Sequence, residues 1–201
     1  MSPGATFERV YYALKAQLGS GRHAPGEHLE PAALSLDLNA SITPVRDALH
    51  RLVGEGLVEA PRGDGFRAPP VTEVGLRHLY RWNASLLGLA TRSLGGHVPV
   101  RVSAASTADG WLERTERLFA AIAARSGNPG HMAAIARLND RLRPIRCAEL
   151  DLIHRREEEV AEMSDRLAGG EAVALRRSIA AYHRRRERLA AEIVAALQPP
   201  R

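Results

Sequence analysis

Residues 41–58 have the sequence SITPVRDALHRLVGEGLV, and this stretch decides how the N-terminal part of the chain folds. Ser41 or Thr43 can cap a helix, and Pro44 suits the first turn because the N–H that proline lacks would be unpaired there. Apolar residues then recur at i, i+3, i+4 and i+7, at positions 45, 48, 49 and 52. This spacing predicts a helix with one buried face, from which Arg46 and His50 point outward. The glycines at 54 and 56 end the helix.

The segments before and after this helix predict a helix-turn-helix followed by a hairpin. Residues 7–18 carry apolar side chains at helical spacing, and Pro31 suits the first turn of a second, short helix. Two short strands, at 57–59 and 66–68, flank the turn sequence RGDG. A hairpin directly after a helix-turn-helix is a wing. Residues 1–70 are therefore predicted to form a winged helix-turn-helix of three helices and a small β-hairpin.

The chain from residue 71 onward has almost only helical signals. Apolar residues recur at helical spacing in five stretches, which begin near residues 79, 111, 135, 150 and 175. Residues 97–110 are predicted as a loop. Five or six antiparallel helices with short loops form a bundle, so we expect residues 71–201 to be an all-helical domain. The two prolines at 69 and 70 are a stiff linker, and the fold class is mainly α.

Composition and charge narrow the class of protein. The single cysteine, Cys147, excludes an intramolecular disulfide, and nowhere are there about 18 consecutive apolar residues. We therefore expect a cytoplasmic protein without a membrane partner. The net charge of +5 is unevenly divided, because residues 1–70 carry seven Arg or Lys against eight Asp or Glu. Any contact of this part with nucleic acid must rest on a few well-placed cations rather than on a broad positive field.

Three segments resemble the GntR family of bacterial regulators. The sequences GRHAPGEHL at 21–29, SITPVRDALHRL at 41–52 and EGLV at 55–58 match that family in order and spacing. The C-terminal part is similar to the FadR-like branch, whose ligand-binding domain is a helical bundle. That likeness rests on the helix opening at 79–94 and on LAGGEA at 167–172. The resemblance implies a transcriptional repressor or activator, not an enzyme, that binds a short palindromic operator on double-stranded DNA as a homodimer.

The same resemblance places the helix near Thr43 in the major groove and the wing against the DNA backbone or the minor groove. Arg46 can reach guanine O6 and N7 with two hydrogen bonds, and hydroxyl groups can donate to phosphate. Gly63 allows the wing backbone to approach DNA closely. The candidate DNA contacts are Ser41, Thr43, Arg46, His50, Arg62 and Gly63. For Arg46 and His50, a solvated helix face without DNA contact is the alternative interpretation.

The sequence departs from the family at several positions. Members usually carry arginine where this chain has Ile42, so one expected DNA contact is missing. Many members of the FadR-like branch bind a divalent metal through an aspartate, a histidine four residues later and two further histidines. When aligned on Phe119, those four positions are occupied by Glu116, Ala120, Glu159 or Val160, and Tyr182 or His183. Because at most one imidazole remains, we expect no metal and no other cofactor.

The resemblance also implies a small-molecule effector site, with Asn83, Glu116, Glu159 and His183 as its candidate residues. The run from His183 to Arg186 otherwise indicates a solvent-exposed charged face, and Trp82 and Trp111 indicate core positions. A second functional hypothesis is a degenerate relative that acts mainly through protein association and binds DNA weakly. An enzyme is disfavoured, because the sequence has no nucleophile-base pair, glycine-rich phosphate loop or metal spacing.

Overall fold

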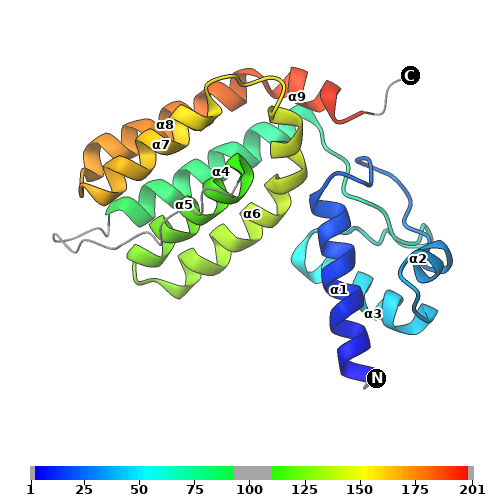
Figure 1. The fold of residues 1–201 in the computed structure, drawn as a ribbon. Helices are drawn as coiled ribbons and strands as arrows, with labels where there is room; N and C mark the ends of the chain where they lie inside the picture. The colour runs from blue at the N-terminus through cyan, green and yellow to red at the C-terminus, as the bar shows by residue number, and fades with distance from the viewer. Residues whose placement is uncertain (1–2, 93–109, 199–201) are drawn as a thin grey trace.

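The structure is a computed structural model that describes residues 3–92 and 110–198. Nine α-helices make up most of this described part (Figure 1). The N-terminal part holds α1 (Pro3–Gly19), α2 (Pro31–Asp37) and α3 (Ile42–Glu55). The C-terminal bundle holds α4 (Glu73–Arg92), α5 (Trp111–Arg125), α6 (Pro129–Glu149), α7 (Arg156–Ala168), α8 (Ala172–Arg188) and α9 (Ala190–Ala196). The predicted, mainly α fold is confirmed.

Helices α1, α2 and α3 enclose one hydrophobic cluster. The four α3 positions that the helical spacing predicted to be buried are all 0% exposed: Val45, Ala48, Leu49 and Leu52. Val10 and Leu14 of α1 belong to the same cluster. Ser41 is the N-cap of α3, although its hydroxyl makes no capping hydrogen bond, and Gly56 ends the helix with a left-handed φ of 74°. The opposite face of α3 is left exposed, and that face carries the candidate DNA contacts.

The predicted β-hairpin wing is not confirmed, because no strand is present in the described residues. Glu59 and Arg67 exchange backbone hydrogen bonds of 2.9 Å in both directions, and the pairing stops there as an isolated bridge. The next hydrogen-bonded pair of the hairpin, closer to its turn, would need a backbone N–H from Pro61, and proline has none. Leu29 donates its N–H to the carbonyl of Phe66 at 2.8 Å, so the returning segment pairs with the chain before α2 as well.

The C-terminal bundle buries two further clusters. The larger one contains Phe119, Ile122, Ile135, Met163 and Ile179, and the smaller one lies where α4, α6 and α9 meet. Two predicted helical stretches have different limits: α6 runs on to Glu149 with Pro144 inside it, and α8 and α9 divide the last stretch near Leu189. The loop predicted for residues 97–110 lies outside the described residues, apart from Gly110.

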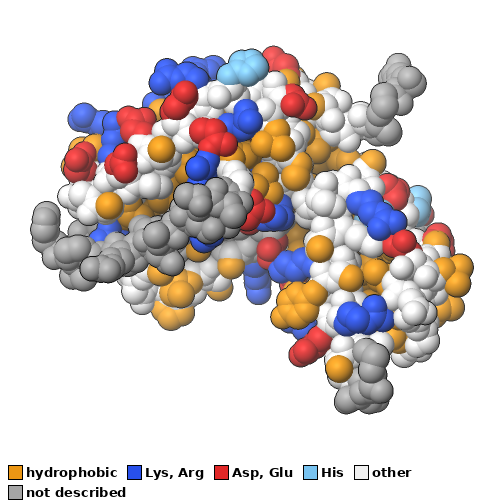
Figure 2. Space-filling model, viewed as in Figure 1, with side chains coloured by type: hydrophobic (Ala, Val, Ile, Leu, Met, Phe, Trp, Pro, Cys, Tyr) orange, Lys and Arg blue, Asp and Glu red, His pale blue; other side chains and the backbone are white. Residues whose placement is uncertain are grey.

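The N-terminal helices and the bundle contact each other mainly through α1 and α6 (Figure 1). Lys15 Nζ lies 2.6 Å from Asp140 Oδ2 across this junction. A Cβ built on Gly19 would lie 2.9 Å from Arg143 Cδ, so the end of α1 approaches α6 as closely as a glycine allows. Figure 2 shows acidic and basic side chains together at the junction. Among the described helices, none has both the length and the apolar character needed to cross a membrane.

Candidate DNA-binding surface and polar core

The exposed face of α3 carries the side chains predicted to contact DNA. Ser41, Thr43, Arg46 and His50 are all exposed and lie along the N-terminal two thirds of this helix. Arg62 and Gly63 are exposed in the loop between residues 59 and 67, where Gly63 has a φ of 79°. A left-handed φ strains any residue with a Cβ, so this position favours glycine.

Ion pairing distinguishes two cations in this N-terminal part. Arg9 donates to backbone carbonyls. Four other basic side chains pair with carboxylates: Arg22 with Asp37, Arg51 and Lys15 with Glu55, and Arg67 with Glu59. Of the seven Lys and Arg side chains within residues 3–70, only those of Arg46 and Arg62 form no ion pair, hydrogen bond or ring contact. Figure 2 shows acidic and basic side chains interspersed on the visible face of this part. Its free positive charge is therefore limited to the start of α3 and the loop after it.

His50 has a second contact that the sequence did not indicate. Its ring lies 4.9 Å from the ring of Phe66, edge to face. Phe66 is buried and its carbonyl accepts the N–H of Leu29. His50 therefore attaches α3 to the returning segment of the loop, in addition to being exposed on the candidate DNA-binding face.

A charged cluster at the other end of α3 attaches the helix to α1. The hydroxyl of Tyr11 donates to both carboxylate oxygens of Glu55 at 2.7 and 2.9 Å. Burial tends to raise the pKa of Glu55, but the hydrogen bonds from Tyr11 and Lys15 outweigh it and lower the pKa. Burial likewise tends to lower the pKa of Lys15, but Asp140 and Glu55 raise it. Both groups therefore remain charged, and α3 is held in one orientation on α1.

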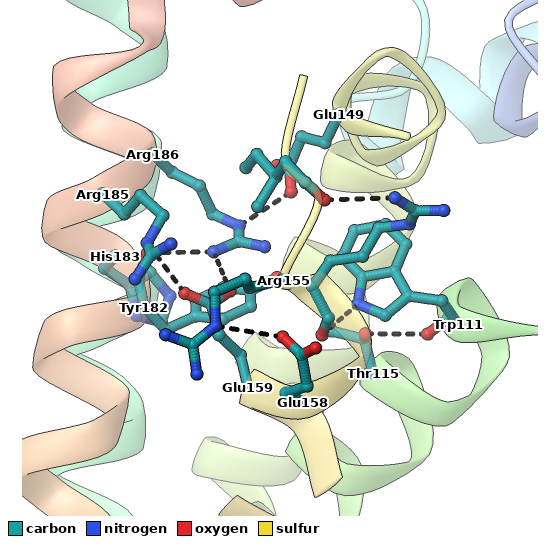
Figure 3. A network of polar contacts seen from close by, with 12 residues as sticks. Trp111, Thr115, Glu149, Arg155, Glu158, Glu159, Tyr182, His183, Arg185 and Arg186 are labelled. Carbon is teal, nitrogen blue, oxygen red and sulfur yellow. Dashed lines mark hydrogen bonds and ion pairs between the residues drawn. The ribbon is translucent and has the colours of Figure 1, made fainter. Parts of the chain in front are cut away.

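A polar network lies inside the C-terminal bundle (Figure 3). Arg186 is 0% exposed; its Nε donates to Glu149 Oε2 at 2.7 Å and its Nη1 to Glu159 Oε2 at 2.9 Å. Glu149 also accepts the hydroxyl hydrogen of Tyr80 at 2.7 Å. The guanidinium carbon of Arg186 lies 3.3 Å from the centroid of the Tyr182 ring. One buried cation thus connects α6, α7 and α8, and its partner Glu149 extends the network to α4.

Several buried donors of this bundle have no partner among the described residues. These donors are Asn83 Nδ2, Tyr182 Oη and Arg186 Nη2, whereas Asn83 Oδ1 and His183 Nε2 are unpaired acceptors. They belong to α4 and α8, the two helices that pack most extensively against each other. A buried donor without an acceptor costs about 1–3 kcal/mol, so such a group of atoms is a site where an acceptor-rich molecule would be stabilised.

The four candidate effector residues lie in different surroundings. Asn83 and His183 are buried in the bundle, while Glu159 is bound by Arg186 and by Arg185, whose Nε lies 3.0 Å from it. Glu116 is instead bound by Arg143 at 2.5 Å, and it faces the junction with the N-terminal helices. No hydrogen bond or ion pair in the described residues joins the four directly.

The metal site of the FadR-like branch does not fit the side chains present. Ala120 has no ligand atom, Glu116 is bound by Arg143, and His183 Nδ1 is hydrogen-bonded to the Ile179 carbonyl at 2.7 Å. The described residues contain no cluster of three His, Cys, Asp or Glu side chains that could hold a metal ion.

The sequence did not indicate that Arg186 and His183 are buried. Arg186 and His183 belong to a run that was predicted to be solvent-exposed, and that interpretation is wrong for both, since they are 0% and 1% exposed. Arg184 of the same run is exposed, as predicted. Trp82 is a further correction, because it is 54% exposed, whereas Trp111 is buried as expected. In α8, residues 175, 179, 182, 183 and 186 lie on one helical face, which is the signal that could have revealed the buried arginine.

Buried His183 predicts a dependence of stability on pH. Burial, with the nearby charges of Arg186 and Arg146, lowers its pKa from the usual 6.5 to about 3. Below pH 6.5 the unfolded chain binds a proton that the folded protein does not, so stability decreases as the pH falls towards 3. We expect this histidine to contribute a slope of roughly 1 kcal/mol per pH unit.

The measurement is urea denaturation between pH 7 and 4, with His183→Gln for comparison. The slope of unfolding free energy against pH should be smaller in the variant. Identical slopes would show that His183 is protonated in the folded protein.

Comparisons with known proteins find similarity to bacterial transcriptional regulators in the N-terminal part of the chain. The model of the family described as bacterial regulatory proteins, gntR family, matches residues 6–67. An HTH-type transcriptional regulator of Bacillus subtilis (strain 168), YdhC, is 27% identical over 88 residues, which are 44% of this chain and 39% of that relative. The chain thus matches about two fifths of the length of this relative.

Two solved structures have a similar fold over nearly the whole chain. E. coli McbR/YncC is 24% identical with a TM-score of 0.65, covering 93% of this chain and 97% of that one. A GntR transcriptional regulator from Rhodococcus sp. RHA1 is 17% identical with a TM-score of 0.73, covering 94% and 98%. At these identities, both comparisons establish a shared fold. Residues 6–67 therefore match the GntR family of bacterial regulatory proteins, and the chain as a whole has the fold of these two solved structures.

Proposed function

We propose that the protein is a sequence-specific transcriptional regulator that reads an operator through α3. The observation that carries the proposal is the pair of unpartnered, exposed cations, Arg46 on α3 and Arg62 in the following loop. Arg46 is positioned to contact base edges, while Arg62 contacts phosphate. Ser41 and Thr43 at the start of α3 add hydroxyl donors, and Gly63 allows close backbone approach.

The regulator acts as a homodimer of two-domain chains, with residues 1–70 as the DNA-binding domain and residues 71–201 as the dimerisation and effector domain. The separate hydrophobic clusters of the two parts support this division. Trp82 and Leu89 support dimerisation through the bundle, since both are exposed and lie seven residues apart on one face of α4. A two-fold dimer presents two copies of α3 to the half-sites of a palindrome.

A small anionic effector binds inside the bundle and changes operator affinity. The unpaired donors of Asn83, Tyr182 and Arg186 support this site, because a carboxylate would accept hydrogen bonds from several of them. Glu159 positions Arg186 there rather than contacting the effector.

Replacing Arg46 with alanine is expected to weaken operator binding by about 1–3 kcal/mol and to relax the preference for one base. Arg62→Ala is expected to weaken binding to every sequence and to reduce the salt dependence by about one counterion. Fluorescence anisotropy measures both effects with DNA from upstream of the protein's own gene, at two salt concentrations and against random DNA. Small carboxylates are then added to the complex to search for the effector.

The matched control is Arg137→Ala, since Arg137 is an exposed arginine on α6, away from α3. Wild-type affinity in Arg46→Ala would refute the placement of the recognition helix. A second candidate function is protein association with weak DNA binding, which is favoured by the exposed Ile42 at the position where the family carries arginine. Binding that does not discriminate the operator from random DNA would select this second function.

A further inference from the structure

A cavity of about 430 Å³ lies where the N-terminal helices meet the C-terminal bundle. One wall comes from α1, from the segment after α3 and from the linker at Pro69 and Pro70. The other comes from α6, with Leu79 of α4 and Leu197 near the C-terminal end. Any molecule bound there would contact both parts of the chain.

Apolar side chains provide much of the surface of this cavity. Leu57 and Val71 line it from the N-terminal side, and Leu79 and Ile145 from the bundle. Such a lining would stabilise the apolar body of a ligand, since each buried CH₂ group contributes about 0.8 kcal/mol.

The charged side chains at the cavity are neutralised with one exception. Lys15 is paired with Asp140 and Glu55, and Arg51 also contacts Glu55. Arg143 lies 2.5 Å from Glu116 and 2.7 Å from Glu113. Arg146 adds a second cation 3.8 Å from Glu116. The cations and carboxylates of these two groups are therefore equal in number.

The exception is Arg141. This residue lines the cavity, is exposed and forms no ion pair or hydrogen bond in the described part of the chain. Its position is restrained, because a Cβ built on Gly56 at the end of α3 would lie 4.0 Å from Arg141 Cδ. The cavity thus combines an apolar lining with one uncompensated positive charge, next to the helix proposed to contact DNA.

We propose that this junction cavity is a binding site for a small amphipathic molecule with one negative charge. The anionic group pairs with Arg141, and the apolar body lies against Leu57, Val71 and Ile145. A ligand in this position restrains the orientation of α3 relative to the bundle. In a dimer this restraint changes the spacing of the two α3 helices and therefore operator affinity, a consequence that rests on the proposed DNA-binding function.

The test uses anilinonaphthalene sulfonate, an apolar monoanion that fluoresces on leaving water, titrated into the full chain without DNA. We expect saturable binding that decanoate displaces and uncharged decanol displaces much less. Arg141→Ala is expected to weaken binding about tenfold, as the loss of one charge-assisted hydrogen bond predicts. Ala16→Trp fills the cavity from the exposed surface of α1 and is expected to abolish binding at this site.

Arg137→Ala is the matched control on the same helix and should bind the probe like the wild type. The proposal is overturned if Arg141→Ala and Arg137→Ala bind alike, or if Ala16→Trp leaves the titration unchanged. Probe binding that appears only after a dimer has been diluted to monomers would also overturn the proposal. It would show that a second copy of the chain fills the cavity in the dimer. Since no DNA is present, failure of the operator experiment does not affect this result.

Discussion

Glu149→Gln is expected to lower the free energy of unfolding by about 3–5 kcal/mol, because it leaves the Arg186 guanidinium buried with a single carboxylate partner. Both residues of this pair are 0% exposed, and Glu149 also accepts the hydroxyl hydrogen of Tyr80. Burial raises the pKa of Tyr80, and the charge of Glu149 raises it further, so the phenol remains a donor. The measurement is urea denaturation followed by circular dichroism at neutral pH.

Two controls separate the buried charge from general disturbance. Glu158→Gln changes an exposed carboxylate that pairs with exposed Arg155, and is expected to change stability by less than about 1 kcal/mol. The double variant Glu149→Leu with Arg186→Met replaces the pair by apolar side chains and should recover much of the lost stability. A single Glu149→Gln variant as stable as Glu158→Gln would show that Arg186 is not buried as described.

Leu49→Ala and Phe119→Ala are expected to destabilise different parts of the chain. Both side chains are 0% exposed, Leu49 in the cluster of α1–α3 and Phe119 in the bundle. Truncation of a buried leucine costs about 2–5 kcal/mol and of a buried phenylalanine about 3–5 kcal/mol. Hydrogen exchange resolved by peptide should show faster exchange in α3 for the first variant and in α5 and α8 for the second.

This pair of variants also tests the proposed division at residue 70. If the two parts are separate domains, Leu49→Ala should abolish operator binding and leave exchange in the bundle unchanged. Phe119→Ala is the reciprocal control. Equal acceleration throughout the chain in both variants would show that the described residues unfold as one cooperative unit.

The candidate DNA-binding face was predictable because it depends on local sequence. The apolar spacing in α3 determines which side of that helix is buried, and the outward positions of Arg46 and His50 follow from it. The contact between His50 and Phe66 was not predictable, since the two residues are 16 positions apart and meet only when the loop returns. The hairpin prediction failed at Pro61, where strand-forming neighbours are interrupted by a residue that cannot donate.

The polar network inside the bundle was also not predicted from the sequence, because its partners are remote from one another along the chain. Arg186 belongs to an arginine-rich run, and arginine is rarely buried unless it is paired. Its partners Glu149 and Glu159 precede it by 37 and 27 residues and lie on two other helices. The sequence contains the charges but not their distances, so an exposed helix face was the natural prediction.

By itself, the sequence determined the helical fold class, the likeness of the N-terminal part to the GntR family and the buried face of α3. All three depend on spacing within short segments, where periodicity and turn chemistry act locally. Only the tertiary structure decided which charges are neutralised and which are free. Arg186 is neutralised inside the bundle, whereas Arg46 and Arg62 are free on the candidate DNA-binding face and Arg141 is free at the junction cavity. The physical reason is that electrostatic pairing and burial depend on distances between segments remote in sequence, and packing of the helices sets those distances.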